Sequence, residues 1–196
     1  YIIELYVQDD RLVIMYTRTE YSVDDDGYYN NYRDYTNALV YDISDRTNPV
    51  KMGNISQSGY YNTMRVRDGY VYVISNFYAD TAAPRADTAA YIPEVQGSAM
   101  AASDIYMPQR QMGDQYTVIT SFSLENPSEK TDSKAVFGSN GMCYVSTENI
   151  YVTEGWYGQD DAEVTRTSIR KVSYKDGILH GEAQTKEDGT LNDSFS

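Results

Sequence analysis

Aromatic and acidic side chains gather in two segments of the sequence, residues 21–35 and 154–161. Flat aromatic rings stack on sugar faces or on cationic groups, and carboxylates accept hydrogen bonds from the same ligands. The alternative is that the tyrosines only pack these segments onto the rest of the chain and that the acids are solvated. We predict a ligand site formed by Tyr28, Tyr29, Tyr32, Trp156, Tyr157 and Asp160.

The run "DDDGYYN" at 24–30 places three acids side by side, and calcium binds about six to eight oxygen ligands. The run lacks the alternating acids and the distant Glu of an EF-hand loop. One interpretation is a calcium site in which Asp24 and Asp26 combine with oxygens from other loops. The other is that these acids are solvated in a turn. No other cofactor is indicated.

Residue combinations that support catalysis are scarce in this sequence. His180 is the only histidine, it falls in an expected strand, and no Gly-x-Ser-x-Gly motif accompanies it. Cys143 lies between Met142 and Tyr144, which is typical of a small core residue rather than a nucleophile. The sequence contains no Cys/His metal cluster and no Walker-type phosphate loop. We therefore predict no catalytic residues.

Composition narrows the range of partners. The 196 residues carry a net charge of −13, so nucleic acid and anionic membrane surfaces are poor candidates. No apolar run approaches the about 18 residues that would suggest a membrane span. A single cysteine allows no internal disulfide, which fits a cytosolic protein or a bacterial secreted one. A signal peptide, if the protein has one, lies outside this sequence.

A related pattern occurs three times in the chain and indicates the elements that must carry these residues. The segments "VQDDRLVIMY", "VRDGYVYVIS" and "VSTENIYVTE" begin at Val7, Val66 and Val145. Each reads as two apolar runs joined by a tight turn, and each is followed by an alternating strand and an Asn-Pro or Asp-Gly turn. No long helix is indicated anywhere.

Each repeat therefore predicts four antiparallel strands, here called a to d in chain order. Repeats of four strands at roughly 40–50 residues are typical of β-propeller blades, whereas a β-sandwich would not require one pattern three times over. The predicted strands are 2–7, 12–17, 38–44 and 50–56, then 62–66, 70–76, 116–124 and 134–138, then 142–146, 150–153, 167–174 and 178–184.

The fold class that follows is all-β: a partial β-propeller of about three four-stranded antiparallel blades with long b–c loop insertions. We expect one domain over the whole chain. Its predicted parts are a blade at 1–58, a blade at 59–139 with an insertion at 77–115, a blade at 140–188 and the start of another at 189–196.

Several further motifs resemble one known family. They are "VYDISDRTNP", Gly59-Tyr60-Tyr61 leading to Arg65 and "YVYVISN", "YIPEV", "VSTENIYV" and the closing "GTLNDSFS". Together they resemble a family of uncharacterised bacterial secreted proteins with a β-propeller domain distantly related to WD-type repeats. The family pattern has an acidic segment upstream and further blades downstream, and this sequence shows neither. The resemblance implies a fragment of a propeller and a secreted or cell-surface location in a bacterium.

Antiparallel order places the b–c connections on one face of the propeller and the a–b and c–d turns on the other. The long b–c segments are 18–37, 77–115 and 154–166, and long loops on a rigid scaffold often carry function. Within the second of them, "TAAPRADTAA" at 81–90 reads as a flexible segment rather than a site.

Two functions remain open at this point. The favoured one is a non-catalytic extracellular binding module that presents its Tyr/Asp-rich loops to a glycan, a peptide or a protein. The alternative is a fragment of a propeller enzyme of glycosidase or lyase type, in which Asp24–Asp26 would act with Asp160 or Asp161. An open set of blades also exposes apolar flanks, so self-association through these flanks is expected.

Overall fold

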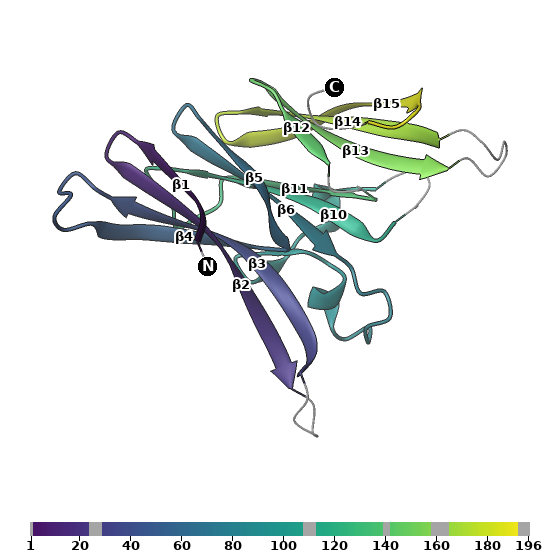
Figure 1. Cartoon of the computed structure of the whole chain (residues 1–196), viewed down its shortest axis with the longest axis horizontal. Coiled ribbons are helices and arrows are strands. Elements are labelled where there is room, and N and C mark those ends of the chain that lie inside the picture. Colours follow the sequence, from purple (N-terminus) through teal and green to yellow (C-terminus); the bar gives the residue numbers. More distant parts are fainter. Residues whose placement is uncertain (1, 24–28, 108–112, 139–141, 158–164, 192–196) are drawn as a thin grey trace.

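The structure is a computed structural model, and it describes residues 2–23, 29–107, 113–138, 142–157 and 165–191, with the backbone alone at 22–23, 29–31 and 156–157. These residues form three twisted, mainly antiparallel sheets that lie one beside the next like the segments of a fan (Figure 1). The prediction of a partial propeller with three blades is confirmed.

Strands follow one another in each sheet in chain order, apart from three short strands of the 77–115 insertion. Sheet 1 contains β1 (Ile2–Gln8), β2 (Arg11–Val23), β3 (Tyr29–Asp42), β4 (Val50–Ser58), β7 (Glu94–Val95) and β8 (Ser98–Ala99). Sheet 2 contains β5 (Tyr60–Arg67), β6 (Tyr70–Tyr78), β10 (Gln115–Ser123), β11 (Asp132–Phe137) and β9 (Ile105–Tyr106). Sheet 3 contains β12 (Cys143–Val145), β13 (Asn149–Tyr157), β14 (Thr165–Lys175) and β15 (Ile178–Asp188).

The first b–c segment differs from the expected loop. β2 and β3 continue past their predicted ends and pair from Arg11↔Asp42 as far as Val23↔Tyr29, so most of 18–37 is a two-stranded ribbon. Ladder hydrogen bonds and the cross-strand pairs Arg18–Tyr35 and Thr19–Asp34 hold the ribbon together. The third segment is also shorter than predicted, because β13 runs on to Tyr157.

The 77–115 insertion also differs from the expected long loop, and the segment 81–90, which was expected to be flexible, ends in a 3₁₀ turn. The insertion contains two 3₁₀ turns, η1 (Thr88–Ala90) and η2 (Ala102–Asp104), and three strands of two residues each. β7 pairs with β4 of sheet 1 through Gln57↔Val95, and β9 runs parallel to β11 of sheet 2. The insertion therefore ties the outer edges of two neighbouring sheets together.

Apolar side chains fill the two interfaces between the sheets. Between sheets 1 and 2, Val13, Met15 and Val40 pack against Val71 and Phe122, all fully buried. Between sheets 2 and 3 the matching cluster joins Tyr72 and Ile119 to Val152, Val172 and Tyr174. Alternation along each strand explains this arrangement, because every second residue points to the same interface.

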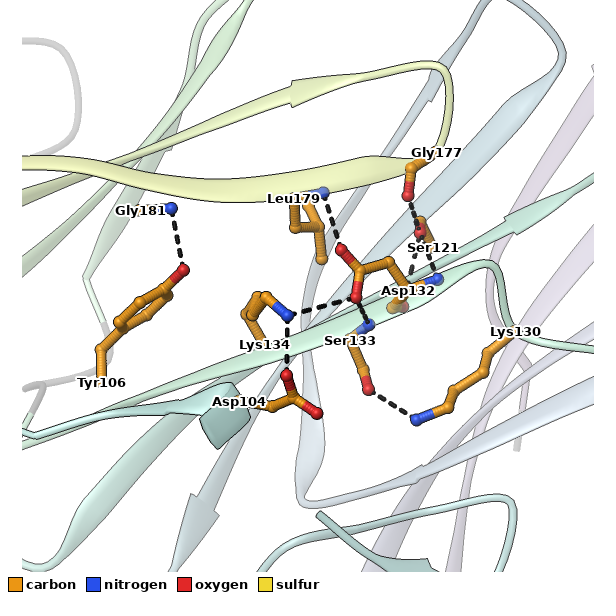
Figure 2. A network of polar contacts seen from close by, with 10 residues as sticks. All are labelled: Asp104, Tyr106, Ser121, Lys130, Asp132, Ser133, Lys134, Gly177, Leu179 and Gly181. Carbon is orange, nitrogen blue, oxygen red and sulfur yellow. Dashed lines mark hydrogen bonds and ion pairs between the residues drawn. The ribbon is translucent and has the colours of Figure 1, made fainter. Parts of the chain in front are cut away.

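Polar contacts line the outer part of the interface between sheets 2 and 3 (Figure 2). Asp132 on β11 accepts a hydrogen bond of 2.9 Å from the backbone N–H of Leu179 on β15. The Tyr106 hydroxyl accepts one of 2.8 Å from the N–H of Gly181, two residues further along β15. Lys134 bridges Asp132 and Asp104 on the sheet 2 side. These bonds fix the position of the edge strand of sheet 3.

The b–c ends of the three sheets lie on one side of the fan. The far end of the β2–β3 ribbon lies at the bottom of the view, the chain leaving β6 at the lower right and the far ends of β13 and β14 at the right, whereas the β1–β2, β5–β6 and β12–β13 turns lie at the upper left (Figure 1). This arrangement agrees with the face predicted for the long connections. The described part of the chain contains no helix long and apolar enough to cross a membrane.

Candidate functional site

Tyrosines gather around a cleft of about 380 Å³ between sheets 1 and 2, on the side of the b–c connections. These tyrosines are unusually exposed to solvent for aromatic residues: Tyr32 is 69% exposed, Tyr78 57% and Tyr60 38%. Exposed rings around a hollow offer flat binding surfaces. We call this hollow the tyrosine cleft and define it by Tyr32, Asp34, Tyr60, Asn76, Tyr78 and Ala90.

A glycine at the start of sheet 2 positions the floor of the cleft. The N–H of Gly59 donates a 2.7 Å hydrogen bond to the carbonyl of Asp34, and the Gly59 carbonyl accepts one of 2.9 Å from the Thr36 hydroxyl. Gly59 has a φ of +93°, and a Cβ at this position would overlap the carbonyl of Asn76. Only glycine fits this backbone, and it turns the chain so that Tyr60 faces the cleft.

The insertion builds another wall of the cleft. Arg33 on β3 forms an ion pair with Asp87, just before the turn η1. The Asp80 N–H donates a 2.8 Å hydrogen bond to the Ala90 carbonyl, which brings the turn back beside the end of β6. The insertion is anchored by buried apolar side chains of one cluster, which includes Phe77, Val95 and Met100. The cleft thus exists because the insertion folds across two sheets.

The two tyrosines at the centre of the cleft act as a pair. The rings of Tyr60 and Tyr78 stack with centroids 6.0 Å apart at an angle of 26°, and the Tyr60 hydroxyl donates a 3.4 Å hydrogen bond to that of Tyr78. Burial, followed by this hydrogen bond, raises the pKa of Tyr60 to about 12. Tyr60 is therefore neutral at physiological pH and presents an apolar face with a polar tip.

Hydrogen-bond acceptors surround this pair. Asn76 is 5% exposed, and its Oδ1 has no hydrogen-bond partner among the described residues. Asp34 and Asp80 both border the cleft, and Asp34 accepts a 2.6 Å hydrogen bond from the Thr19 hydroxyl. A ligand with flat apolar faces and several hydrogen-bond donors matches this lining.

Of the predicted site residues, only Tyr32 can be placed in the tyrosine cleft. Asp24, Asp26, Tyr28, Asp160 and Asp161 lie outside the described residues. The backbone of Tyr29 belongs to β3, and those of Trp156 and Tyr157 belong to β13 rather than to a loop.

Sequence reasoning missed three residues of the cleft. Tyr60 falls before the predicted strand 62–66, Asn76 at the end of the predicted strand 70–76, and Tyr78 in the predicted insertion 77–115. The available signal was Gly59-Tyr60-Tyr61, where a glycine precedes two bulky aromatics at a strand start. Among the described residues, no three His, Cys, Asp or Glu side chains cluster closely enough to hold a metal ion.

The two residues weighed for catalysis lie away from the tyrosine cleft. The His180 side chain is 74% exposed on β15, and its Nδ1 lies 3.6 Å from a Glu182 carboxylate oxygen. The Cys143 thiol donates a long 3.5 Å hydrogen bond to Asn62, and burial raises its pKa to about 11. A thiol with a raised pKa is a poor nucleophile at neutral pH.

Three sheets lie side by side with their long connections on one face. Each has four strands that follow one another in chain order, and short strands of the insertion extend the first two sheets. This arrangement defines an open β-propeller that carries a cleft between its first two blades. The whole chain, residues 1–196, matches the model of a family described as a beta propeller domain, and the chain belongs to this family. Comparisons with curated proteins and with solved structures found no match.

Proposed function

We propose that the chain is a non-catalytic binding module and that the tyrosine cleft receives a glycan. The observation that carries this proposal is the grouping of three exposed tyrosines around a hollow rimmed by acceptors. Sugar rings present flat C–H faces to aromatic rings, and their hydroxyls donate hydrogen bonds to carboxylate and amide oxygens. Peptide or protein partners with exposed donors and apolar side chains would use the same lining.

The experiment is a glycan array followed by titration of each ligand found. Tyr78→Ala removes an exposed ring, so the fold should survive, and the affinity should fall by about fivefold, since an aromatic contact contributes about 1 kcal/mol. Tyr144→Ala is the matched control, because Tyr144 is 49% exposed and stacks on Tyr151 in blade 3. Equal losses in both variants would place the ligand elsewhere, and an array without ligands would remove glycans from the proposal.

One observation supports the alternative, a propeller enzyme of glycosidase or lyase type. Asp34 from blade 1 and Asp80 from blade 2 border the same cleft, and glycoside hydrolysis uses two carboxyl groups on either side of the bond that breaks. A glycan bound by the array should then be cleaved by the wild type and not by Asp80→Asn. Binding without any cleavage supports the module.

The location of the protein is part of the proposal. The sequence resemblance implies a secreted or cell-surface protein of a bacterium, where glycans are abundant ligands. Fractionation of the producing cells tests it: recovery of the protein in the cytosol would contradict an extracellular role.

A further inference from the structure

A second cleft, of about 330 Å³, lies at the outer rim between blades 2 and 3. We call it the outer cleft and define it by Ile105, Tyr106, Val136, Arg170, Val172 and Gly181. It is separate from the tyrosine cleft, with which it shares no lining residue. Binding in the outer cleft is therefore independent of the proposed function.

An arginine in the outer cleft is buried and only partly paired. Arg170 is 6% exposed, and its Nη2 donates a 2.9 Å hydrogen bond to Oε2 of Glu154. Its Nη1 is also buried and has no hydrogen-bond partner among the described residues. A buried guanidinium donor without an acceptor costs free energy. The Nη1 group of Arg170 is therefore suited to a ligand that supplies an acceptor.

The register of the strands shows which way Arg170 points. Arg170 precedes Val172 by two residues on β14, and Val172 packs in the apolar cluster between blades 2 and 3. Side chains two residues apart on a strand share a face. Arg170 therefore faces blade 2, across the same gap in which Val136 and Tyr106 line the cleft.

Tyr106 supplies a second donor from the opposite wall. Its hydroxyl oxygen accepts a 2.8 Å hydrogen bond from the N–H of Gly181, which leaves the hydroxyl proton free to be donated (Figure 2). Gly181 has no side chain, and a Cβ there would overlap the Tyr106 ring. The glycine thus lets the hydroxyl end of the ring approach β15 and fixes the direction of its hydroxyl.

Charge in and around the outer cleft favours an anion despite the acidic chain. Glu154, which is not among the lining residues, already accepts from Arg170, and the lining carboxylate Glu182 accepts a 2.6 Å hydrogen bond from the Ser173 hydroxyl. Lys171 also lines the cleft, and Lys186 lies close enough to Glu154 to influence its charge.

The remaining lining residues are apolar apart from Gln184, and they include the exposed Met107. We propose that the outer cleft binds a carboxylate that carries an apolar chain. Arg170 Nη1 and the Tyr106 hydroxyl donate to the carboxylate oxygens, while Val136, Ile105 and Met107 cover the chain. Charge-assisted hydrogen bonds of this kind are about twice as strong as neutral ones, which gives the site a preference for the ionised acid. The source is either a free organic acid or the end of a polypeptide with an apolar last residue.

The test uses hexanoate and 1-hexanol as probes on the full chain, followed by NMR and calorimetry. The proposal expects hexanoate to bind about tenfold or more tightly than hexanol and to shift the amide signal of Gly181. Equal affinity for both probes, or no binding of hexanoate, would overturn it. A peptide that ends in leucine with a free carboxylate, compared with its amidated form, then separates a chain end from a free acid.

Two sets of variants locate the binding. Tyr106→Phe keeps the ring and removes the donor, so hexanoate should bind several-fold more weakly while hexanol is unaffected. Because Met107 is 62% exposed, Met107→Lys and Met107→Glu should fold, and they should move the hexanoate affinity in opposite directions. Tyr78→Ala, in the tyrosine cleft, is the control and should leave the hexanoate affinity unchanged. A hexanoate affinity that does not respond to Tyr106→Phe or to either Met107 variant would place the carboxylate elsewhere and refute the proposal.

Discussion

Gly59 shows how a single residue fixes the tyrosine cleft. We expect Gly59→Ala to lower the free energy of unfolding by about 3 kcal/mol or more, because a left-handed φ is strained and the new Cβ would overlap the backbone of Asn76. Gly69→Ala is the matched control: Gly69 has a similar φ of +79° but nothing within 4 Å of its Cβ position. It should cost about 1 kcal/mol from backbone strain alone. Urea denaturation measures the change in the free energy of unfolding for both variants. Equal changes would contradict the close approach of Gly59 to the backbone of Asn76.

The burial of Tyr60 should be measurable through the pKa of its hydroxyl. Its pKa is raised to about 12 by burial and by the hydrogen bond with Tyr78, so Tyr78→Phe should lower this pKa while leaving it above the ordinary value of 10. Because the folded pKa exceeds the unfolded one, Tyr60 contributes stability that is complete below pH 10 and is lost as the pH rises through about 12. NMR titration of ¹³Cζ-labelled tyrosine follows both effects. An unchanged pKa in Tyr78→Phe would mean that the hydroxyls do not interact.

Single residues of the site were only partly predictable. Tyr32 was predicted because it belongs to a dense tyrosine segment, whereas Tyr60 and Tyr78 lie just outside the predicted strands 62–66 and 70–76 and outside the two aromatic and acidic segments. Their exposure arises from their position at a strand start and a strand end beside a gap between blades. That gap exists only once the blades are assembled, and periodicity within one strand carries no information about it.

Among the elements, the insertion should respond most strongly to its buried anchor. Val95 is 2% exposed and lies in the strand that pairs with β4, so Val95→Ala should cost about 2 kcal/mol through lost packing. Arg33→Gln removes a half-exposed ion pair and should cost only about 0.5 kcal/mol. Chemical denaturation gives the free energy of unfolding of both variants and so compares the two losses. Hydrogen exchange at the Asp80 amide, which bonds to Ala90, should quicken more in Val95→Ala, and the reverse order would make the ion pair the main anchor.

The strands that could be predicted were those with a long alternating pattern. Val13, Met15 and Val71 fall on such patterns and mark the blade interfaces correctly. The ends of β2 and β3 could not be predicted, because Thr, Asn, Asp and Tyr suit a solvated ribbon and a loop equally well. β7, β8 and β9 have two residues each, too few to show a period. β7 and β9 form because the edges of β4 and β11 offer unpaired backbone groups, and β8 then pairs with β7.

For the molecule as a whole, the fan leaves an apolar flank on blade 1. Val13 and Met15 point toward blade 2, so the alternate residues of the same strands point away from it. Leu5 pairs with Ile14 and Val7 with Leu12, and these pairs form rows on the outward face. Leu5 and Val7 are 59% and 57% exposed. Rows of this type are what adjacent blades bury against one another, so the flank is suited to another apolar sheet.

We expect the isolated chain to associate with a second copy through this flank, because burying such apolar rows is favourable at about 25 cal/mol per Å² of surface removed from water. Sedimentation velocity over a wide range of concentration should show a reversible increase in mass. Leu5→Lys should suppress it, since a charge would have to be desolvated at the contact. Val50→Lys is the control: Val50 is 55% exposed at the β3–β4 turn, away from the rows. A monomer at all concentrations, or equal suppression by both variants, would show that the flank does not mediate association.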